Sequence, residues 1–184
     1  MIRFIAPSLL CLAAASVHGA DEPLFPEEDA VMQEFLKARE DFRLFNDCRP
    51  MPLEVWVSEN NFELTRERIL TLVESRLRAA RLYRAPVTLE GLDDESLERM
   101  IEYRQSNQLV IGVDTFESGR AYSISMIFRK WLSDSASSEN GFGDTWQVGS
   151  YGINGTASGI LQTVSEMIDE FINEYLRVNG VACD

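Results

Sequence analysis

Three strand-like segments follow one another without a helix between them, and this order limits the folds open to the chain. They cover residues 108–116, 121–132 and 144–151. In the middle segment, Tyr122, Ile124, Met126 and Phe128 share one face, and Ser123 and Ser125 lie on the other, as on a strand with one buried face. A tight turn joins the first two segments, and a polar loop over residues 133–143 joins the last two. Consecutive strands joined in this way predict an antiparallel meander.

Helical patterns lie on both sides of the predicted meander. Apolar residues recur at helical spacing over residues 29–46, 64–86 and 157–178, and a shorter acidic helix is expected over residues 94–104. Alternation over residues 52–58 predicts a fourth strand. We therefore predict an α+β domain. It would have a four-stranded, mainly antiparallel sheet with two long helices packed on one face, plus an N-terminal helix.

The ends of two predicted helices carry recognisable signals. Thr65 is placed to cap the second helix, and Thr156 or Ser158 to cap the last. Asn179 and the glycine after it are expected to stop the last helix, and Pro86 to stop the second. The glycines before the last helix match neither phosphate-binding spacing, so that stretch is predicted to be a turn.

The first 20 residues have the pattern of a Sec-type signal peptide, with one arginine, an apolar run and a small-residue exit. Cleavage near Ala20 would leave a flexible acidic leader over residues 21–28 and a single domain over residues 29–184. The apolar run is too short for a good membrane span, and the leucine before its single cysteine argues against a lipid anchor. We therefore expect a periplasmic or secreted protein.

The charge of the chain narrows the choice of partners. It has 17 basic and 30 acidic residues, which gives a formal net charge of −13 at pH 7. The predicted signal peptide holds one basic and no acidic residue, so cleavage would take the charge to −14. Such a protein is repelled by nucleic acid and by anionic lipid. We expect its partner to be an unidentified envelope protein and not a nucleic acid.

Histidine is confined to His18, inside the predicted signal peptide. The processed protein would therefore lack Ser-His-Asp and Cys-His catalytic systems and His-ligated zinc. No catalytic, cofactor-binding or metal-ligating residue is predicted, and we expect no enzyme. Paired carboxylates could still hydrolyse a glycoside without histidine. The carboxylates near predicted strand ends are Asp114, Glu117, Asp134 and Asp144.

Two cysteines, Cys48 and Cys183, would remain after removal of the signal peptide. In an oxidising compartment, an even pair with one possible connectivity predicts a disulfide. The alternative is a redox-active or intermolecular pair. We favour a structural bond, because an aspartate stands beside each cysteine, whereas reactive cysteines sit in electropositive surroundings.

Arginines are concentrated on the second predicted helix of this otherwise acidic protein. The residues that could form a partner surface are Arg66, Arg68, Arg78 and Arg81. The favoured alternative is a solvated face paired with the protein's own carboxylates, because the arginines spread around the helix. Arg76 differs, because it falls on the apolar stripe. We predict it to be a buried structural charge with a carboxylate or backbone carbonyls as partner.

Two tryptophans lie off the main apolar alternation of their strands. Trp56 and Trp131 fall on the face opposite the predicted core. They either cover the second face of the sheet or mark a partner site. Covering the sheet is the favoured interpretation.

The order of helices and strands supports a resemblance. With "RLRAARLY" closing a helix and "SDSASSENGFGDTW" joining two strands, the chain resembles small secreted proteobacterial proteins of unknown function. Over residues 52–178 it is also similar to α/β periplasmic domains of envelope assembly factors, such as the curli-secretion lipoprotein and the lipoprotein activators of penicillin-binding proteins. The resemblance implies protein–protein contacts without catalysis. We expect a non-enzymatic, exported accessory or binding protein; the alternative is a carboxylate-dependent hydrolase of an envelope polysaccharide.

Overall fold

The structure is a computed structural model that describes residues 26–60, 63–87, 93–116, 121–153 and 155–183. The predicted signal peptide, most of the predicted leader and Glu117 lie outside these ranges. The chain divides into two compact units, residues 1–35 and residues 36–184. In the described part of the first unit, residues 26–35 are helical. The second unit holds the sheet and the remaining helices.

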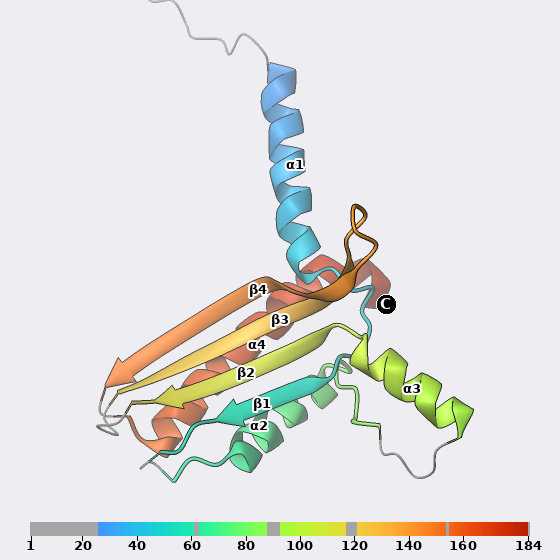
Figure 1. Cartoon of the computed structure of the whole chain (residues 1–184). Coiled ribbons are helices and arrows are strands. Elements are labelled where there is room, and N and C mark those ends of the chain that lie inside the picture. The colour runs from blue at the N-terminus through green and yellow to red at the C-terminus, as the bar shows by residue number, and fades with distance from the viewer. Residues whose placement is uncertain (1–25, 61–62, 88–92, 117–120, 154, 184) are drawn as a thin grey trace, which may run out of the picture. The chain divides into compact units, whose positions relative to one another are not determined.

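Four helices and four strands follow one another along the described part of the chain (Figure 1). They are α1 (Pro26–Leu44), β1 (Leu53–Val57), α2 (Arg66–Ala79), α3 (Asp94–Arg104), β2 (Gln108–Thr115), β3 (Ala121–Ser133), β4 (Asn140–Ile153) and α4 (Ala157–Cys183). This content confirms the predicted α+β class.

The four strands form one sheet in the order β1-β2-β3-β4. β2, β3 and β4 make an antiparallel meander, whereas β1 runs parallel to β2. The sheet is therefore mixed, with two antiparallel strand pairs and one parallel pair, so the predicted antiparallel arrangement is not confirmed for β1. Alternation in a sequence indicates which side chains share a face, but it does not indicate the direction of the neighbouring strand. The parallel pair is possible because a long crossover containing α2 and α3 connects β1 to β2.

One face of the sheet carries the core. Leu109 of β2 lies opposite Phe128 of β3, which in turn lies opposite Trp146 of β4, and all three side chains are buried. α2 and α4 contribute buried residues to the same cluster. These are Ile69, Val73, Leu77, Ile160, Val164, Ile168, Phe171 and Tyr175. Burial of each large apolar side chain contributes about 1.5–3 kcal/mol, so this layer holds most of the stability.

The opposite face of the sheet has a thinner cover. The indole of Trp56 lies over Gly112, where an added Cβ would stand 2.1 Å from the ring. Only glycine leaves room for this contact. Val110 is buried on the same face, although it is not part of the main core cluster. Trp56 therefore covers this second face of the sheet, in agreement with the favoured interpretation for this residue.

The N-terminal end of α2 agrees with the sequence-based prediction, whereas its C-terminal end does not. Thr65 caps the helix, since its hydroxyl accepts a hydrogen bond from the Arg68 backbone nitrogen at 3.3 Å. The helix ends at Ala79, earlier than the expected stop at Pro86. Arg81 takes a left-handed conformation with φ 60°, and the chain after it runs alongside the segment that precedes β1. The early end of α2 is thus caused by contacts with a distant segment of the chain.

The last helix is longer than expected. The Thr156 hydroxyl accepts a hydrogen bond from the Gly159 backbone nitrogen at 3.1 Å, as an N-cap does. The helix then continues to Cys183, so Asn179 does not stop it. The Asn179 amide is buried and has hydrogen-bond partners outside its own turn, which explains why this asparagine is tolerated inside the helix.

Within the second unit, the end of α1 is tied to β3 and β4. Leu44 is buried, whereas Phe42 is exposed, so the predicted apolar stripe of this helix is not covered along its length. Arg43 donates through Nε to the carbonyl of Thr145 at 3.1 Å, and the Thr145 hydroxyl donates to the carbonyl of Arg43 at 2.7 Å. The ammonium of buried Lys130 donates to the carbonyl of Phe42, and burial lowers the Lys130 pKa to about 8.

Candidate functional site: a two-part cleft at Trp131

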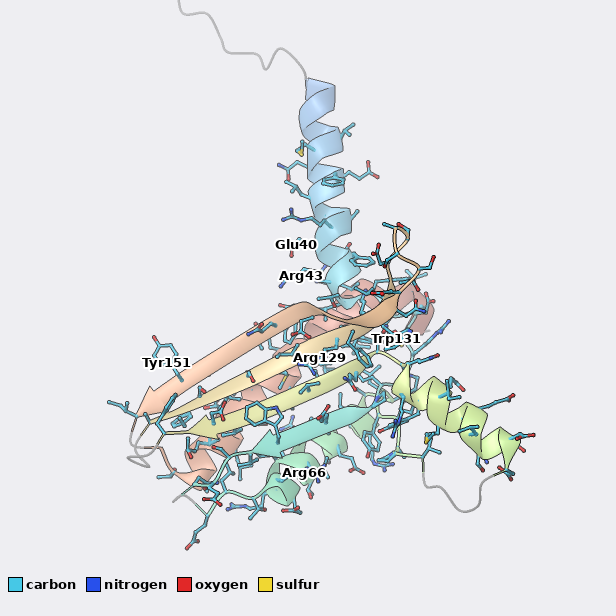
Figure 2. All side chains as sticks on the ribbon, viewed as in Figure 1. Glu40, Arg43, Arg66, Arg129, Trp131 and Tyr151 are labelled. Carbon is cyan, nitrogen blue, oxygen red and sulfur yellow. A yellow bond between two sulfur atoms is a disulfide. The ribbon has the colours of Figure 1, made fainter. Side chains whose placement is uncertain are left out.

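A cleft with two compartments lies where the C-terminal end of α3 meets β3 and β4, and Trp131 lines both (Figure 2). The polar compartment, of about 390 Å³, is lined by Asn46, Arg49, Pro50, Arg84, Glu102, Gln105, Ser106, Asn107 and Trp131. The aromatic compartment, of about 460 Å³, is lined by Ile101, Tyr103, Arg104, Gln105, Gln108, Trp131 and Phe142.

Side-chain amides fix the walls of the polar compartment. Asn107 donates to Oδ1 of Asn46 at 2.7 Å, and its own oxygen accepts from the backbone nitrogen of Trp131 at 2.8 Å. Asn46 donates to the carbonyl of Arg49 at 3.1 Å and to the hydroxyl of Tyr175 at 3.0 Å. Because each amide is held by defined partners, this part of the cleft is formed before any ligand arrives.

The charges around the cleft are opposite in sign to the charge of the whole protein. Three arginines and one glutamate line the two compartments, in a chain of net charge −13. Arg84 pairs with Glu102 at 3.1 Å. The Arg49 side chain is 76% exposed and lies 3.7 Å from Asp47. Guanidinium groups at the mouth of a cleft attract an anionic group.

The aromatic compartment offers an apolar surface. The rings of Trp131 and Phe142 meet edge to face with their centroids 5.0 Å apart. The Arg84 guanidinium lies 5.8 Å from the centre of the Tyr103 ring. Desolvation raises the pKa of Tyr103 above its ordinary value of 10.0, and the phenol is neutral at neutral pH. Such a surface suits an aliphatic or aromatic group.

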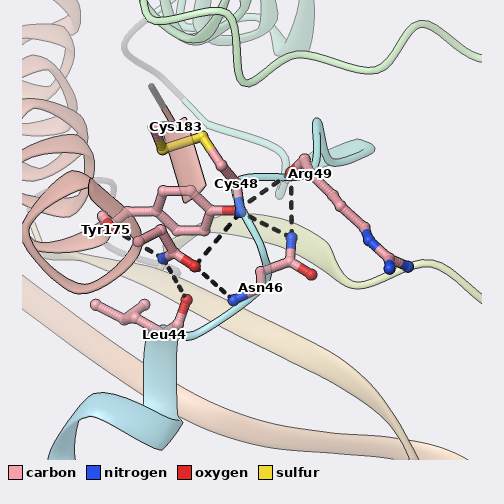
Figure 3. The surroundings of a disulfide bond; sticks show 7 residues. Leu44, Asn46, Cys48, Arg49, Tyr175 and Cys183 are labelled. Atoms are coloured by element: carbon pink, nitrogen blue, oxygen red, sulfur yellow. Dashed lines mark hydrogen bonds between the residues drawn. A yellow bond between two sulfur atoms is a disulfide. The ribbon is translucent and has the colours of Figure 1, made fainter. Parts of the chain in front are cut away.

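The wall formed by residues 46–50 is anchored from behind by α4 (Figure 3). Cys48 and Cys183 form the predicted disulfide, with their Cα atoms 5.1 Å apart. Oδ1 of Asn179 accepts a hydrogen bond from the Asn46 backbone nitrogen at 2.7 Å. The Tyr175 hydroxyl donates to a carbonyl of the same wall, at 3.2 Å. A covalent bond and buried hydrogen bonds thus hold the residues that line the cleft.

The arginines of the predicted partner surface do not gather into one site. Arg66 donates to a backbone carbonyl of β1 at 2.7 Å. Arg78 pairs with Glu74, one turn earlier on α2, at 2.7 Å. Arg68 and Arg81 are exposed. These contacts agree with the alternative of a solvated face whose charges are met by the protein itself.

Arg76 bridges α2 and α4 on the solvent side of the helical layer. Its guanidinium donates to both carboxylate oxygens of Asp169, at 2.8 and 3.0 Å, and to the hydroxyl of Ser165 at 3.0 Å. The expected carboxylate partner is present. The expected burial is wrong, because the side chain is 44% exposed. A long arginine side chain at the rim of an apolar stripe can reach past it into water.

Two of the carboxylates that could have supported a hydrolase, Asp144 and Asp134, have separate partners. Asp144 pairs with Arg129 at 2.7 Å. Asp134 accepts hydrogen bonds within its own loop, from the backbone nitrogen of Ala136 and from a serine hydroxyl, and these bonds lower its pKa. Neither residue, nor Asp114, lines the cleft at Trp131.

A third cavity is an open groove of about 580 Å³ between α2 and α4. It is lined by Glu67, Arg68, Thr71, Leu72, Leu161, Gln162 and Ser165. The groove lies on two neighbouring helices only, whereas the Trp131 cleft combines residues from segments far apart in the chain. We therefore take the cleft as the candidate site and the groove as a useful control surface.

The sequence pointed to Trp131 but not to the residues around it. The available signal was the position of this tryptophan off the apolar alternation. Its hydrogen-bond partner Asn107 and the next residue in the chain of amides, Asn46, are 61 positions apart. Spacing along a sequence gives no measure of such a contact.

The comparisons with known proteins assign no family. In the described part of the chain, no helix is long and apolar enough to cross a membrane. The chain matches none of the models of known protein families, and a search of curated proteins found no match either.

Proposed function

We propose that this protein is an exported binding protein of the bacterial envelope, and that its cleft at Trp131 takes an acidic and apolar segment of another polypeptide. The observation that carries the proposal is the cleft's combination of a basic compartment and an aromatic compartment in an acidic chain. Binding sites of this kind use aromatic and arginine side chains for most of their affinity.

Each compartment would take a different part of the ligand. Arg49, which is largely exposed, and Arg84 would receive a carboxylate. An apolar side chain of the ligand would pack against Trp131 and Phe142. Gln105 lies between the compartments and has an amide suited to a peptide group.

Two features support export. The N-terminal 20 residues follow the signal-peptide pattern. The Cys48–Cys183 bond belongs to the chemistry of an oxidising compartment. A fusion of the first 20 residues to a reporter that is active only after export tests this part of the proposal, and a reporter that stays inactive contradicts it.

Binding is tested by affinity capture with crosslinking from envelope extract, using the full chain and three variants. Trp131→Ala removes the wall shared by the two compartments. Arg49→Glu reverses the charge of a side chain at the polar compartment that is 76% exposed, so we expect the variant to fold. Arg68→Glu makes the same charge change in the α2–α4 groove and is the matched control.

We expect one polypeptide to be captured by the wild type and by the Arg68→Glu protein. Its affinity for the Trp131→Ala and Arg49→Glu proteins should fall about tenfold or more, the loss typical of a residue central to an interface. Equal capture by all four proteins, or capture lost only with Arg68→Glu, would place binding elsewhere.

A further inference from the structure

The two edge strands of the sheet are protected to different extents. At the β1 edge, Arg66 donates through Nε to the carbonyl of Val55 at 2.7 Å. At the β4 edge, Arg43 reaches the carbonyl of Thr145. Beyond this point, no described residue forms a hydrogen bond with the outer backbone groups of residues 147–153. The outward backbone groups in the second half of the edge strand β4 therefore have no hydrogen-bond partner among the described residues.

The register identifies which groups point outward. The Phe116 nitrogen donates to the carbonyl of Ala121, so odd-numbered residues of β3 bond to β2 and even-numbered ones to β4. Met126 lies opposite Val148, so even-numbered residues of β4 bond back to β3. Odd-numbered residues direct their N–H and C=O groups away from the sheet. They are Gln147, Gly149, Tyr151 and Ile153.

The side chains of this edge add no protection. No charged residue and no proline occurs from Thr145 to Ile153. Tyr151 is 90% exposed and Ile153 is 77% exposed, and Figure 2 shows Tyr151 projecting from β4. Natural edge strands are normally blocked by charges, prolines or bulges, because unpaired backbone groups recruit another strand.

We infer that this edge pairs with the same edge of a second copy of the chain. The two β4 strands would run antiparallel about a twofold axis at Ser150, the centre of the open stretch. Gln147 would then lie opposite Ile153 of the second copy, and Gly149 opposite Tyr151 of the second copy. All four outward residues would be paired, and the two sheets would join into one.

The open stretch is complementary to the same stretch of a second copy. Two proteins of net charge −13 repel each other over most of their surfaces, but this stretch brings together only uncharged residues. The pairing also lays the Tyr151 ring over the bare backbone of Gly149, as aromatic side chains do with glycines across a sheet.

The inference does not depend on the proposed binding function. Trp131 pairs with Phe142 near the start of β4, whereas the open stretch lies at the end of that strand. Figure 2 places Trp131 and Tyr151 at opposite ends of the sheet, so pairing leaves the cleft accessible. A result against one proposal therefore does not decide the other.

The test measures molar mass by light scattering over a wide range of concentration, with the full chain and two double variants. Gln147→Lys with Ile153→Lys places lysine opposite lysine at both symmetric positions. Gln147→Lys with Ile153→Glu places opposite charges there. The substituted side chains are exposed in both cases. Circular dichroism checks that the variants fold.

We expect the wild type to have the mass of two chains. The lysine pair should weaken the dimer about tenfold, and the lysine–glutamate variant should regain it. A monomeric wild type at all concentrations overturns the inference. So does a dimer that responds equally to both variants, or a monomer that binds an unrelated extended peptide at this edge.

Discussion

Side-chain hydrogen bonds attach the last helix to the rest of the domain at two places, and these two places differ in burial. At its C-terminal end, the Asn179 amide bonds to the backbone of Leu44 and Asn46. Near its middle, Asp169 and Ser165 together accept hydrogen bonds from Arg76. Asn179 is 1% exposed, whereas the Arg76 side chain is 44% exposed.

The difference shows why a count of hydrogen bonds does not rank attachments. When a buried partner is removed, the groups left behind lose their bond and cannot reach water, which costs about 1–3 kcal/mol for each group. When an exposed ion pair is removed, water takes its place, and the loss is about 0–1 kcal/mol. We therefore expect the C-terminal end of α4 to be the firm attachment.

Removal of the disulfide should have the largest effect. We expect Cys48→Ser with Cys183→Ser to lower the free energy of unfolding by about 2–4 kcal/mol, because the bond closes a long loop in the unfolded chain. Urea unfolding of the variant and of the wild type with and without reductant measures it. A variant as stable as the oxidised wild type would show that the buried hydrogen bonds suffice at this end.

Asn179→Ala should have the second-largest effect on stability. The Asn179 side chain takes part in four hydrogen bonds, with Leu44, Asn46, Cys48 and Tyr175. Its loss leaves buried backbone groups without partners, so we expect stability to fall by about 2–3 kcal/mol. Asn173→Ala, on the exposed side of the same helix, is the control and should change stability by less than about 0.5 kcal/mol. Similar losses for the two variants would contradict the role of burial.

Tyr175→Phe should cost less, about 1 kcal/mol, because the hydroxyl is removed but the ring still fills its place. It should also change the pH dependence. Burial raises the pKa of Tyr175 from 10.0 to about 12. The folded protein therefore holds the Tyr175 proton up to a higher pH than the unfolded chain does. The stabilisation that results from this difference is fully present below pH 10 and is lost as the pH rises toward 12.

Chemical denaturation at a series of alkaline pH values measures this effect. The wild type should lose stability over that interval, and the Tyr175→Phe protein should lose less. Parallel curves for the two proteins would mean that this hydroxyl does not titrate as its burial requires.

Arg76→Met should have the smallest effect. The exposed ion pair with Asp169 is replaced by water, and the methionine keeps the apolar part of the side chain, so we expect a loss below about 1 kcal/mol. The same urea assay measures it, and added salt should reduce the difference further. A loss as large as that of Asn179→Ala would remove the distinction between the two attachments.

Some parts of this contrast could be predicted from the sequence. The apolar repeat identified the buried stripe of α4, and composition identified the disulfide. Asn179 was misread as a helix stop, because its preference for helix ends is local, whereas its partners lie more than 130 positions away. The parallel direction of β1 was missed for a similar reason, since pairing depends on the crossover and not on alternation.

The candidate site was even less accessible from the sequence. Its walls come from the segments after α1 and α2, the end of α3 and parts of β2, β3 and β4. None of these segments carries a motif of fixed spacing. What the sequence offered was an isolated tryptophan, and the arginines that stood out on α2 serve other purposes, such as the bond of Arg66 to the edge of β1.

The bond between Cys48 and Cys183 also has a topological consequence. It closes residues 48–183 into a ring that contains every strand of the sheet, with residues 1–47 and residue 184 outside the ring. A ring remains one molecule after a single cut. A protease that cleaves once in the connection between β3 and β4, over residues 134–139, would therefore leave one covalently linked molecule until the disulfide is reduced.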